Sequence, residues 1–324
     1  MKVCLYAEGE SLFRQCGIGA AIRHFRKALL LNGVHIVEDC RDADIVHIHT
    51  IGPRGAYLAR TLKAKVVMHA HTTAEDFRGS FIFSEYISPV LARYLRMLYS
   101  SADMVLCPTE HTRRVLLSHG IVADIRVISN GVDLDAFTHM EERRKRHRRK
   151  MGLEGIVPFS VGNVFLRKGV DIFVDVARQF DNTFVWYGAI SKLADPRVLR
   201  LVREAPPNVR FAGFVEDVVD AYAGGDIFLF PSREENQGIA VLEAAAARKP
   251  LLISSIPAFD YLEEEKHCLK AKSPEEFARQ LEVLLEDASL RRRLSRGAYE
   301  LARQHDLKLV GKTLKGYYEE LLSK

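Results

Sequence analysis

Short apolar runs alternate with segments of helical periodicity along most of the chain, and this alternation restricts the fold more than any other feature of the sequence. The apolar runs include DIVHIHT at 44–50, AKVVMHAH at 64–71 and IFLFPS at 227–232. Strands that are buried on both faces have such continuous apolar runs, and strands that alternate with helices form parallel sheets. The sequence therefore predicts an α/β fold with helices on both faces of parallel sheets.

The alternation occurs twice, which indicates two domains. A chain of 324 residues exceeds the usual size of a single hydrophobic core. We place the boundary at the basic segment EERRKRHRRK, residues 141–150. We expect an N-terminal Rossmann-like domain at 1–150, a second one at 151–304, and a C-terminal helix at 305–324 that returns to the first domain. Ligands of doubly wound sheets bind outside the carboxyl ends of the strands, so we expect a cleft between two facing domains.

Composition and cysteine usage indicate a cytoplasmic protein. No apolar run reaches the roughly 18 residues that span a bilayer, and the N-terminal segment lacks a signal-peptide pattern. The cysteines are widely scattered and include no C-x-x-C pair, which predicts reduced thiols. They are Cys4, Cys16, Cys40, Cys107 and Cys268.

The formal charge of +5 is unevenly placed, because residues 141–150 carry seven Lys or Arg. If this segment reaches an anionic membrane surface, each basic residue adds roughly 1 kcal/mol of attraction. Nucleic acid is the other partner class for such a run, but no stacking aromatics are interleaved with it. We therefore expect an anionic membrane surface as a partner and no nucleic acid.

Two loops could hold a phosphate. Gly17 and Gly19 in CGIGAA come just ahead of a predicted helix, where backbone amides and the helix dipole favour an anion. A dinucleotide fingerprint needs a third glycine, but Ile22 stands in its place, so a simple turn is an equal alternative. In VGNVFLRKG, Arg167 and Lys168 precede a second predicted helix. Adjacent cations there suit a diphosphate, and the alternative is a pair of solvated surface charges.

A pair of glutamates eight residues apart stands where an apolar strand gives way to an alanine-rich helix. In EENQGIAVLEAAAARKP, Glu235 comes just before the helix and Glu243 lies within it. The amide groups of 236–239 open the helix and could donate to a diphosphate, while the carboxylates could accept from sugar hydroxyls. This combination fits a nucleotide-sugar. The alternative is that both glutamates are ordinary polar residues of a helix.

Four histidines end two neighbouring predicted strands. His47 and His49 are two residues apart, as are His69 and His71, so each pair shares one face of its strand. A zinc site is one interpretation, but no cysteine joins the histidines and polar residues at strand ends are common. We therefore expect no metal here.

The segment between 77 and 103 is rich in aromatic residues. Ile87, Leu91, Tyr94 and Leu95 follow helical spacing, with arginines on the opposite face. A basic amphipathic helix of this kind can lie in a lipid headgroup layer. The equal alternative is an ordinary helix that packs on the sheet.

Together, the Glu-x7-Glu helix, VGNVFLRKG, ISNGVDLDAF and the Gly17-Ile18-Gly19 loop resemble the retaining GT-B glycosyltransferases of family 4. The resemblance covers nearly the whole chain. It implies that Glu235 and the backbone after it hold the donor sugar, and that Glu243 binds ribose hydroxyls. Most of that family has Arg where this chain has Asn163, and Arg167 is the expected substitute.

The same resemblance assigns His71 a hydrogen bond to the reacting sugar, with Asp76 and Glu75 as candidates of lower rank. No carboxylate is placed to act as a covalent nucleophile. We therefore expect front-face transfer, in which the departing diphosphate takes the acceptor's proton and is stabilised by Arg167, Lys168 and the helix start. No Asp-x-Asp pattern demands a divalent metal, although Mg²⁺ could stimulate the reaction.

A closer similarity concerns the acceptor. The segments MHAHTTAEDFRGSFI, GPRG, PTEHTRR and ISNGVDL look like the bacterial 1,2-diacylglycerol 3-glucosyltransferases. This implies UDP-glucose as donor, diacylglycerol as acceptor, an α-linked monoglucosyl product and peripheral association with the inner face of the cell membrane. Alternatives are UDP-galactose, a glycolipid acceptor that gives a diglucosyl product, or a soluble acceptor. A nicotinamide-dependent oxidoreductase and a non-catalytic UDP-sugar-binding protein are more remote.

These patterns give three sets of candidate residues. The catalytic set is His71, Glu235, Lys168 and Arg167. The donor-binding set is Gly17, Gly19, Asn163, Asn236, Gln237, Gly238, Ile239 and Glu243. The membrane and acceptor set is Phe81, Phe83, Tyr86, Leu91, Arg93, Tyr94, Leu95 and Arg96.

Overall fold

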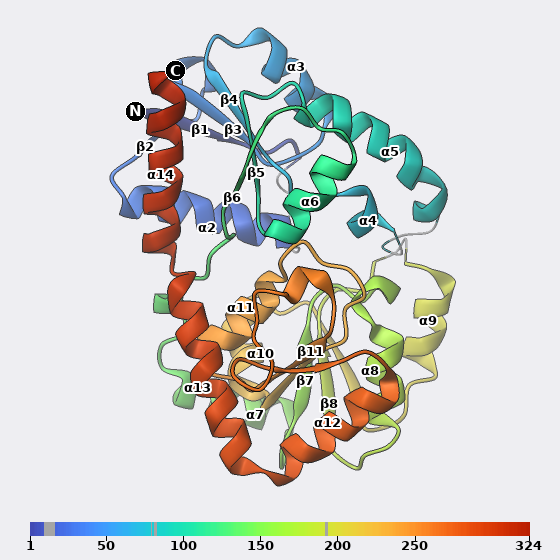
Figure 1. Ribbon diagram of the computed structural model, residues 1–324. Helices are drawn as coiled ribbons and strands as arrows, with labels where there is room; N and C mark the ends of the chain where they lie inside the picture. Colours follow the sequence, from blue (N-terminus) through green and yellow to red (C-terminus); the bar gives the residue numbers. More distant parts are fainter. Residues whose placement is uncertain (10–16, 79, 81–82, 192–193) are drawn as a thin grey trace. The chain divides into compact units, whose positions relative to one another are not determined.

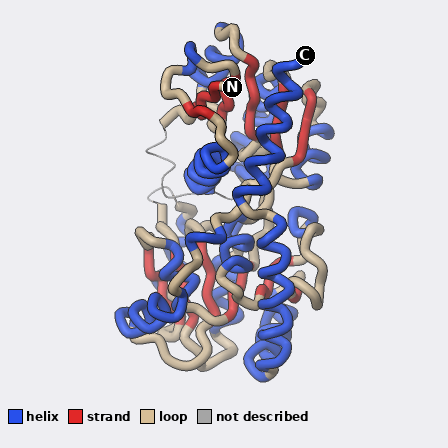
Figure 2. Tube along the Cα trace, turned by 90° about the vertical axis from the view of Figure 1, so that its left-hand side faces the viewer, coloured by secondary structure: helices blue, strands red, loops and turns tan. Residues whose placement is uncertain are grey.

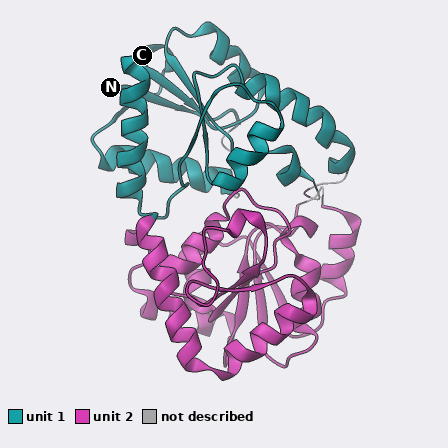
Figure 3. Cartoon of the chain, in the orientation of Figure 1, with its two compact units in different colours: residues 1–78, 83–132, 305–324 teal, residues 79–82, 133–304 magenta. Residues whose placement is uncertain are grey.

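The computed structural model describes residues 1–9, 17–78, 80, 83–191 and 194–324. These residues divide into two compact units (Figure 3). Unit 1 combines 1–78, 83–132 and 305–324, and unit 2 combines 79–82 and 133–304. The division falls at residue 132, ahead of the basic segment, rather than at residue 150.

Within its described residues, unit 1 is built on one six-stranded parallel sheet in the order β2-β1-β3-β4-β5-β6 (Figure 1). The inner strands β3, β4 and β5 are almost wholly buried, as their continuous apolar sequences predict. The strands are β1 Lys2–Tyr6, β2 His35–Ile36, β3 Ile45–Ile48, β4 Lys65–His69, β5 Met104–Cys107 and β6 Asp124–Val127.

Helices cover this sheet, and several begin at a side chain that caps the first turn. The side chains of Thr73 and Thr109 accept hydrogen bonds from backbone amides at the starts of α4 and α6. These amides have no acceptor within the helix itself. The C-terminal helix α14 packs against α2, and the two helices cross (Figures 1 and 2). The helical segments of unit 1 are α2 Gly17–Leu31, η1 Cys40–Asp42, α3 Pro53–Thr61, α4 Ala74–Phe77, α5 Ser84–Tyr99, α6 Glu110–Ser118 and α14 Leu307–Ser323.

The described part of unit 2 is built on a second six-stranded parallel sheet, in the order β12-β11-β10-β7-β8-β9. Its core contains Trp186 and Phe173, whose rings meet edge to face at 5.1 Å. The strands are β7 Pro158–Val161, β8 Phe184–Tyr187, β9 Val209–Gly213, β10 Ile227–Phe230, β11 Leu251–Ser254 and β12 Leu269–Ala271. The predicted α/β fold with tandem parallel sheets is therefore confirmed.

The helical segments of unit 2 lie before the first of these strands, between the strands and after the last one. Three short segments are 3-10 helices and the others are α-helices. They are η2 Leu134–Ala136, α7 Met140–Met151, η3 Leu166–Lys168, α8 Val170–Ala177, α9 Pro196–Arg203, α10 Val218–Gly224, α11 Ile239–Ala246, η4 Pro257–Phe259, α12 Pro274–Glu286 and α13 Ala288–Gln304.

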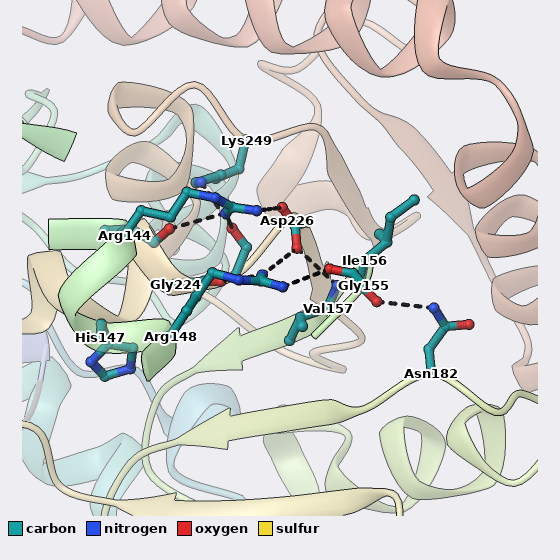
Figure 4. A network of polar contacts seen from close by, with 12 residues as sticks. Arg144, His147, Arg148, Gly155, Ile156, Val157, Asn182, Gly224, Asp226 and Lys249 are labelled. Carbon is teal, nitrogen blue, oxygen red and sulfur yellow. Dashed lines mark hydrogen bonds and ion pairs between the residues drawn. The ribbon is translucent and has the colours of Figure 1, made fainter. Parts of the chain in front are cut away.

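The basic segment is a helix rather than a break between domains. It forms α7, which packs against α10 in unit 2. Arg144 and Arg148 each pair with Asp226, at 2.6 and 2.9 Å (Figure 4). Arg143 pairs with Asp217 at 2.6 Å. These acids lie more than seventy residues further along the chain, so the run itself gives no sign of its partners.

Two cysteines correct the expectation of reduced thiols. Cys4 of β1 and Cys40 of η1 form a disulfide, with their Cα atoms 5.1 Å apart. Their separation of 36 residues hides this proximity, which arises because η1 packs on β1. Cys107 and Cys268 are buried and free, and Cys16 lies outside the described residues. In the described part of the chain, no helix has both the length and the apolar character needed to cross a membrane.

Candidate active site

Two loops at the carboxyl ends of β7 and β10 are joined by reciprocal hydrogen bonds. The backbone amide of Arg233 donates to the carbonyl of Arg167 at 2.8 Å. In return, the guanidinium of Arg167 donates to the carbonyl of Glu234 at 2.9 Å. Gly169 completes the junction, because a Cβ there would lie 2.0 Å from the carbonyl oxygen of Pro231. The two loops that carry the predicted diphosphate and sugar contacts therefore form one structural element.

An ion pair lies at the centre of this junction. The Lys168 ammonium donates to Oε1 of Glu235, which also accepts from the Ser232 hydroxyl at 2.9 Å. The side chains of Lys168 and Glu235 are only 16% and 7% exposed. Burial alone would raise the pKa of Glu235, but the charges of Lys168 and Arg167 outweigh it and hold this pKa below its ordinary value. Glu235 therefore stays ionised next to a buried cation.

The start of α11 has no side-chain cap. Gly238, with a left-handed φ of 77°, is the N-cap and supplies no side-chain cap. The first amides of an α-helix have no acceptor within the helix, so they present donors at this point. The helix begins at Ile239, so Asn236 and Gln237 lie in the turn before it rather than in its first turn. The hydroxyl of Tyr261 donates to the Gln237 carbonyl at 2.9 Å and fixes that turn.

Glu243 lies one turn into α11 and is held by a residue that the sequence did not reveal. The hydroxyl of Tyr222, on α10, lies 2.7 Å from Oε2 of Glu243. Tyr222 is fully buried, and burial together with the charge of Glu243 raises its pKa well above the ordinary value. The tyrosine stays protonated and donates to the carboxylate. No motif in the sequence marks Tyr222, because its contact depends on how α10 packs against α11.

The four histidines come together in unit 1, as their positions at neighbouring strand ends predict. His49 Nδ1 and His71 Nε2 lie 3.0 Å apart, and the hydroxyl of Tyr318 lies 2.7 Å from His47 Nδ1. The ring of Phe25 lies 4.7 Å from that of His69, centroid to centroid. His47, His49 and His69 place one nitrogen each within 4.8 Å of one another, while neighbouring rings stack face to face.

Burial keeps this cluster neutral. It lowers the pKa of His47 and of His71 to about 3, and it lowers the pKa of His49 and His69 well below the ordinary value. The unfolded chain therefore binds more protons than the folded chain between about pH 3 and pH 6.5. Stability should fall as the pH falls below about 6.5.

We expect the free energy of unfolding, measured by urea titration, to be smaller at pH 5 than at pH 7.5. Each buried histidine contributes up to about 1.4 kcal/mol per pH unit in this window, where few carboxylates titrate. His71→Gln keeps an acceptor for His49 and removes one titrating ring, so its pH dependence should be shallower. Equal stability of the natural protein at the two pH values would contradict the neutral cluster.

The remaining candidates are placed as follows. Gly17 and Gly19 lie within α2 rather than ahead of it, and the residues just before Gly17 lie outside the described residues. Asn163 is half-buried in the turn after β7. Oε1 of Glu75 accepts a hydrogen bond from Nε2 of His119 at 2.8 Å. Asp76 forms part of the first turn of α4.

The predicted lipid-facing stripe of α5 needs correction. Leu95 is 3% exposed and packs in the core of unit 1, together with half-buried Leu91 and Tyr94. Tyr94 donates to the carbonyl of Ile51 at 2.7 Å. These residues turn inward because they meet the apolar face of the sheet.

The other face of α5 carries the exposed apolar residues. Tyr86 is 82% exposed and Val90 is 70% exposed, and the exposed arginines Arg93 and Arg96 follow them. The outer face of α5 is defined by Phe83, Tyr86, Ile87, Val90, Arg93, Arg96 and Met97. Phe81 lies outside the described residues.

Comparisons with known proteins agree with this architecture. Residues 14–136 match the model of Glycosyltransferase Family 4, and residues 156–287 match that of Glycosyl transferases group 1. The chain is 34% identical to the processive diacylglycerol alpha-glucosyltransferase of Acholeplasma laidlawii, over 99% of both chains. It is 28% identical to the alpha-monoglucosyldiacylglycerol synthase of Streptococcus pneumoniae, over 76% of this chain and 58% of that one.

Solved structures share the fold. HepE of Anabaena in complex with UDP-glucose superposes with a TM-score of 0.80 at 16% identity, over 99% of this chain and all of the other. Sucrose-phosphate synthase of Thermosynechococcus elongatus superposes with a TM-score of 0.83 at 14% identity, over 100% of this chain and 99% of that one.

The tandem parallel sheets have the GT-B fold, and the family models together with the 34% identical relative show that the chain is a glycosyltransferase. The chain belongs to glycosyltransferase family 4.

Proposed function

We propose that this enzyme transfers glucose from UDP-glucose to 1,2-diacylglycerol with retention of configuration, forming α-monoglucosyldiacylglycerol. The observation that carries the proposal is the 34% identity, over nearly the full length of both chains, to a diacylglycerol alpha-glucosyltransferase. That relative is named as processive, which favours a second candidate function: addition of a further glucose to the monoglucosyl lipid.

In this proposal the donor lies against unit 2. Lys168 and the first amides of α11 face the diphosphate, where a buried cation and a helix start stabilise negative charge. Arg167 contributes a second cation, and Asn163 lies in the same group of loops. Glu235 and the backbone of 236–239 hold the sugar, and Glu243 binds the ribose. The same proposal gives His71 a hydrogen bond to the reacting sugar, and gives Gly17 and Gly19 a part in binding the donor phosphates.

The transfer step then needs no covalent enzyme intermediate. The bond between the sugar C1 and the diphosphate oxygen breaks, and its electron pair stays on the diphosphate. The acceptor hydroxyl oxygen bonds to C1 from the same face, and its proton passes to the departing phosphate oxygen. Positive groups set in advance around that oxygen lower the barrier, because they stabilise charge that develops only in the transition state. Mg²⁺ would stimulate this step by adding to the positive charge near the departing diphosphate.

The acceptor side of the proposal rests on the outer face of α5. Exposed aromatic and aliphatic residues there, flanked by Arg93 and Arg96, suit the headgroup layer of an anionic membrane. We propose peripheral association with the inner face of the cell membrane, from which the lipid acceptor is drawn.

The test is a transfer assay with labelled UDP-glucose and UDP-galactose. Each donor is offered with diacylglycerol or monoglucosyldiacylglycerol in neutral and in anionic vesicles, with and without Mg²⁺. We expect label from UDP-glucose in the lipid fraction, with more product from anionic vesicles. Label that appears only in water-soluble acceptors would contradict the lipid function.

Glu243→Gln should raise the KM for UDP-glucose by about tenfold to a hundredfold and leave kcat little changed, because the lost interaction is a hydrogen bond to a charged group that is present before reaction. Glutamine still offers Tyr222 an acceptor, so the fold should be retained. The matched control is Glu282→Gln, the same change at an exposed position of α12. An unchanged KM would exclude the ribose role of Glu243.

A further inference from the structure

A basic cavity lies in unit 2 at the ends of the strands opposite to those that carry the candidate active site. Its volume is about 550 Å³. It lies at the amino ends of β10 and β11, whereas Ser232 and Glu235 follow the carboxyl end of β10. It is lined by Ile156, Asp226, Arg248, Lys249, Pro250, Ala288, Arg291, Arg292, Ser295 and Arg296. Five of these residues are Lys or Arg and one is acidic.

Asp226, the one acidic residue in the lining of the cavity, is already paired with two arginines of α7. Asp226 accepts from Arg144 at 2.6 Å, from Arg148 at 2.9 Å and from the amide of Val157 at 2.9 Å (Figure 4). Lys249 does not pair with it but donates to the carbonyl of Gly225 at 2.8 Å. Because the charge of Asp226 is taken up by Arg144 and Arg148, it does not balance the five basic residues that line the cavity.

The protonation of Lys249 reflects this positive environment. The pKa of Lys249 is lowered to about 8, chiefly by burial; the charges of Arg144 and Arg148 act in the same direction, and the charge of Asp226 opposes them. A buried ammonium held this way gains from any anion that enters the cavity.

The arginines at the mouth of the cavity are partly fixed in position. Arg291 donates to the carbonyls of Leu284 and Leu285 at the end of α12. Arg248 has a left-handed φ of 55°, rare for a residue with a side chain, and its guanidinium lies 3.5 Å from the ring centroid of Tyr299. Arg292 and Arg296 stand one turn apart on α13 and are exposed. Among the described residues neither of these two has an acidic partner.

We propose that this cavity binds a phosphate-bearing anion at a site separate from the donor site. Guanidinium groups match phosphate oxygens in geometry and charge. Arginine side chains that are already held in place lose little conformational freedom when they bind an anion. The phosphate belongs either to a soluble molecule or to a lipid headgroup, and both present the same oxygens. Binding here does not depend on the identity of the sugar donor or acceptor.

The experiment is a calorimetric titration of inorganic pyrophosphate into the full-length protein, with UDP present in excess to occupy the donor site. In parallel, the protein is mixed with vesicles that contain phosphatidic acid in a neutral lipid background. The test variant is Arg292→Gln with Arg296→Gln. The control variant is Arg293→Gln with Arg303→Gln, which removes the same charge from exposed positions of α13 outside the cavity.

We expect the test variant to weaken binding of pyrophosphate, of the vesicles or of both by about tenfold or more, since each lost contact is a charge-assisted hydrogen bond. The control variant should change binding less than twofold. A loss confined to pyrophosphate assigns the site to a soluble phosphate, and a loss confined to vesicles assigns it to a lipid headgroup. Equal weakening in both variants, or no binding of either probe by the natural protein, would overturn the proposal.

Discussion

Replacing Lys168 by alanine should lower kcat for glucosyl transfer by about 10²- to 10³-fold, because it removes a preset cation from the proposed position of the departing diphosphate. It also leaves the carboxylate of Glu235 buried without its counter-ion. Removing one partner of a buried ion pair costs about 3–5 kcal/mol of stability. The single variant should therefore lose both activity and stability, measured by initial rates at saturating donor and by urea unfolding.

A double variant separates these two losses. In Lys168→Met with Glu235→Leu, no charge is left unpaired, and replacing a buried ion pair by apolar residues of similar size is often neutral. Stability should return toward that of the natural protein, while activity stays low. Recovery of activity along with stability would show that the pair serves the fold alone, and the proposed contact with the diphosphate would be wrong.

Gly169→Ala should be the most damaging single change to the junction of the two loops. Gly169 has a φ of 73°, and an added Cβ would overlap the carbonyl oxygen of Pro231 at 2.0 Å. That oxygen belongs to the backbone, so relief requires the β10–α11 loop to move away from the β7–α8 loop. We expect the free energy of unfolding to fall by about 3 kcal/mol or more, which exceeds the roughly 1–2 kcal/mol that left-handed strain alone would cost. We also expect donor binding to be lost.

Gly213 provides the matched control. Its φ is also 73°, and nothing lies within 4 Å of an added Cβ. Gly213→Ala should therefore show only the strain, about 1–2 kcal/mol, with normal donor binding. If urea unfolding gave the same loss for both variants, overlap with Pro231 would not be what requires glycine at 169.

The sequence predicts best where one residue pattern implies one environment. Continuous apolar runs identified the buried strands, and the two-residue spacing of His47 with His49 and of His69 with His71 placed the four rings in one cluster. The sequence put Glu235 and Lys168 in one expected site; the structure brings these two side chains into contact, and their part in donor binding stays a proposal. In each case the information is local in sequence.

Contacts between distant segments account for what the sequence did not predict. The sequence alone places a domain boundary at the basic run because the acids that pair with it, Asp217 and Asp226, come later in the chain. Helical periodicity predicted a lipid-facing stripe of α5 that includes Leu95. In the structure that side of α5 packs on the sheet, and Tyr86 is exposed on the other side. Tyr222 was missed for the same reason, since nothing near it in sequence marks its contact with Glu243.

The central claim is that a nucleotide's diphosphate binds at the loop junction of unit 2, and a crystal structure of the protein with UDP tests it most directly. We predict the diphosphate in contact with Lys168 and with the first amides of α11, and the ribose hydroxyls at the carboxylate of Glu243. Density for UDP at any other part of the chain, with the Lys168–Glu235 pair and the α11 start unoccupied, would contradict the account.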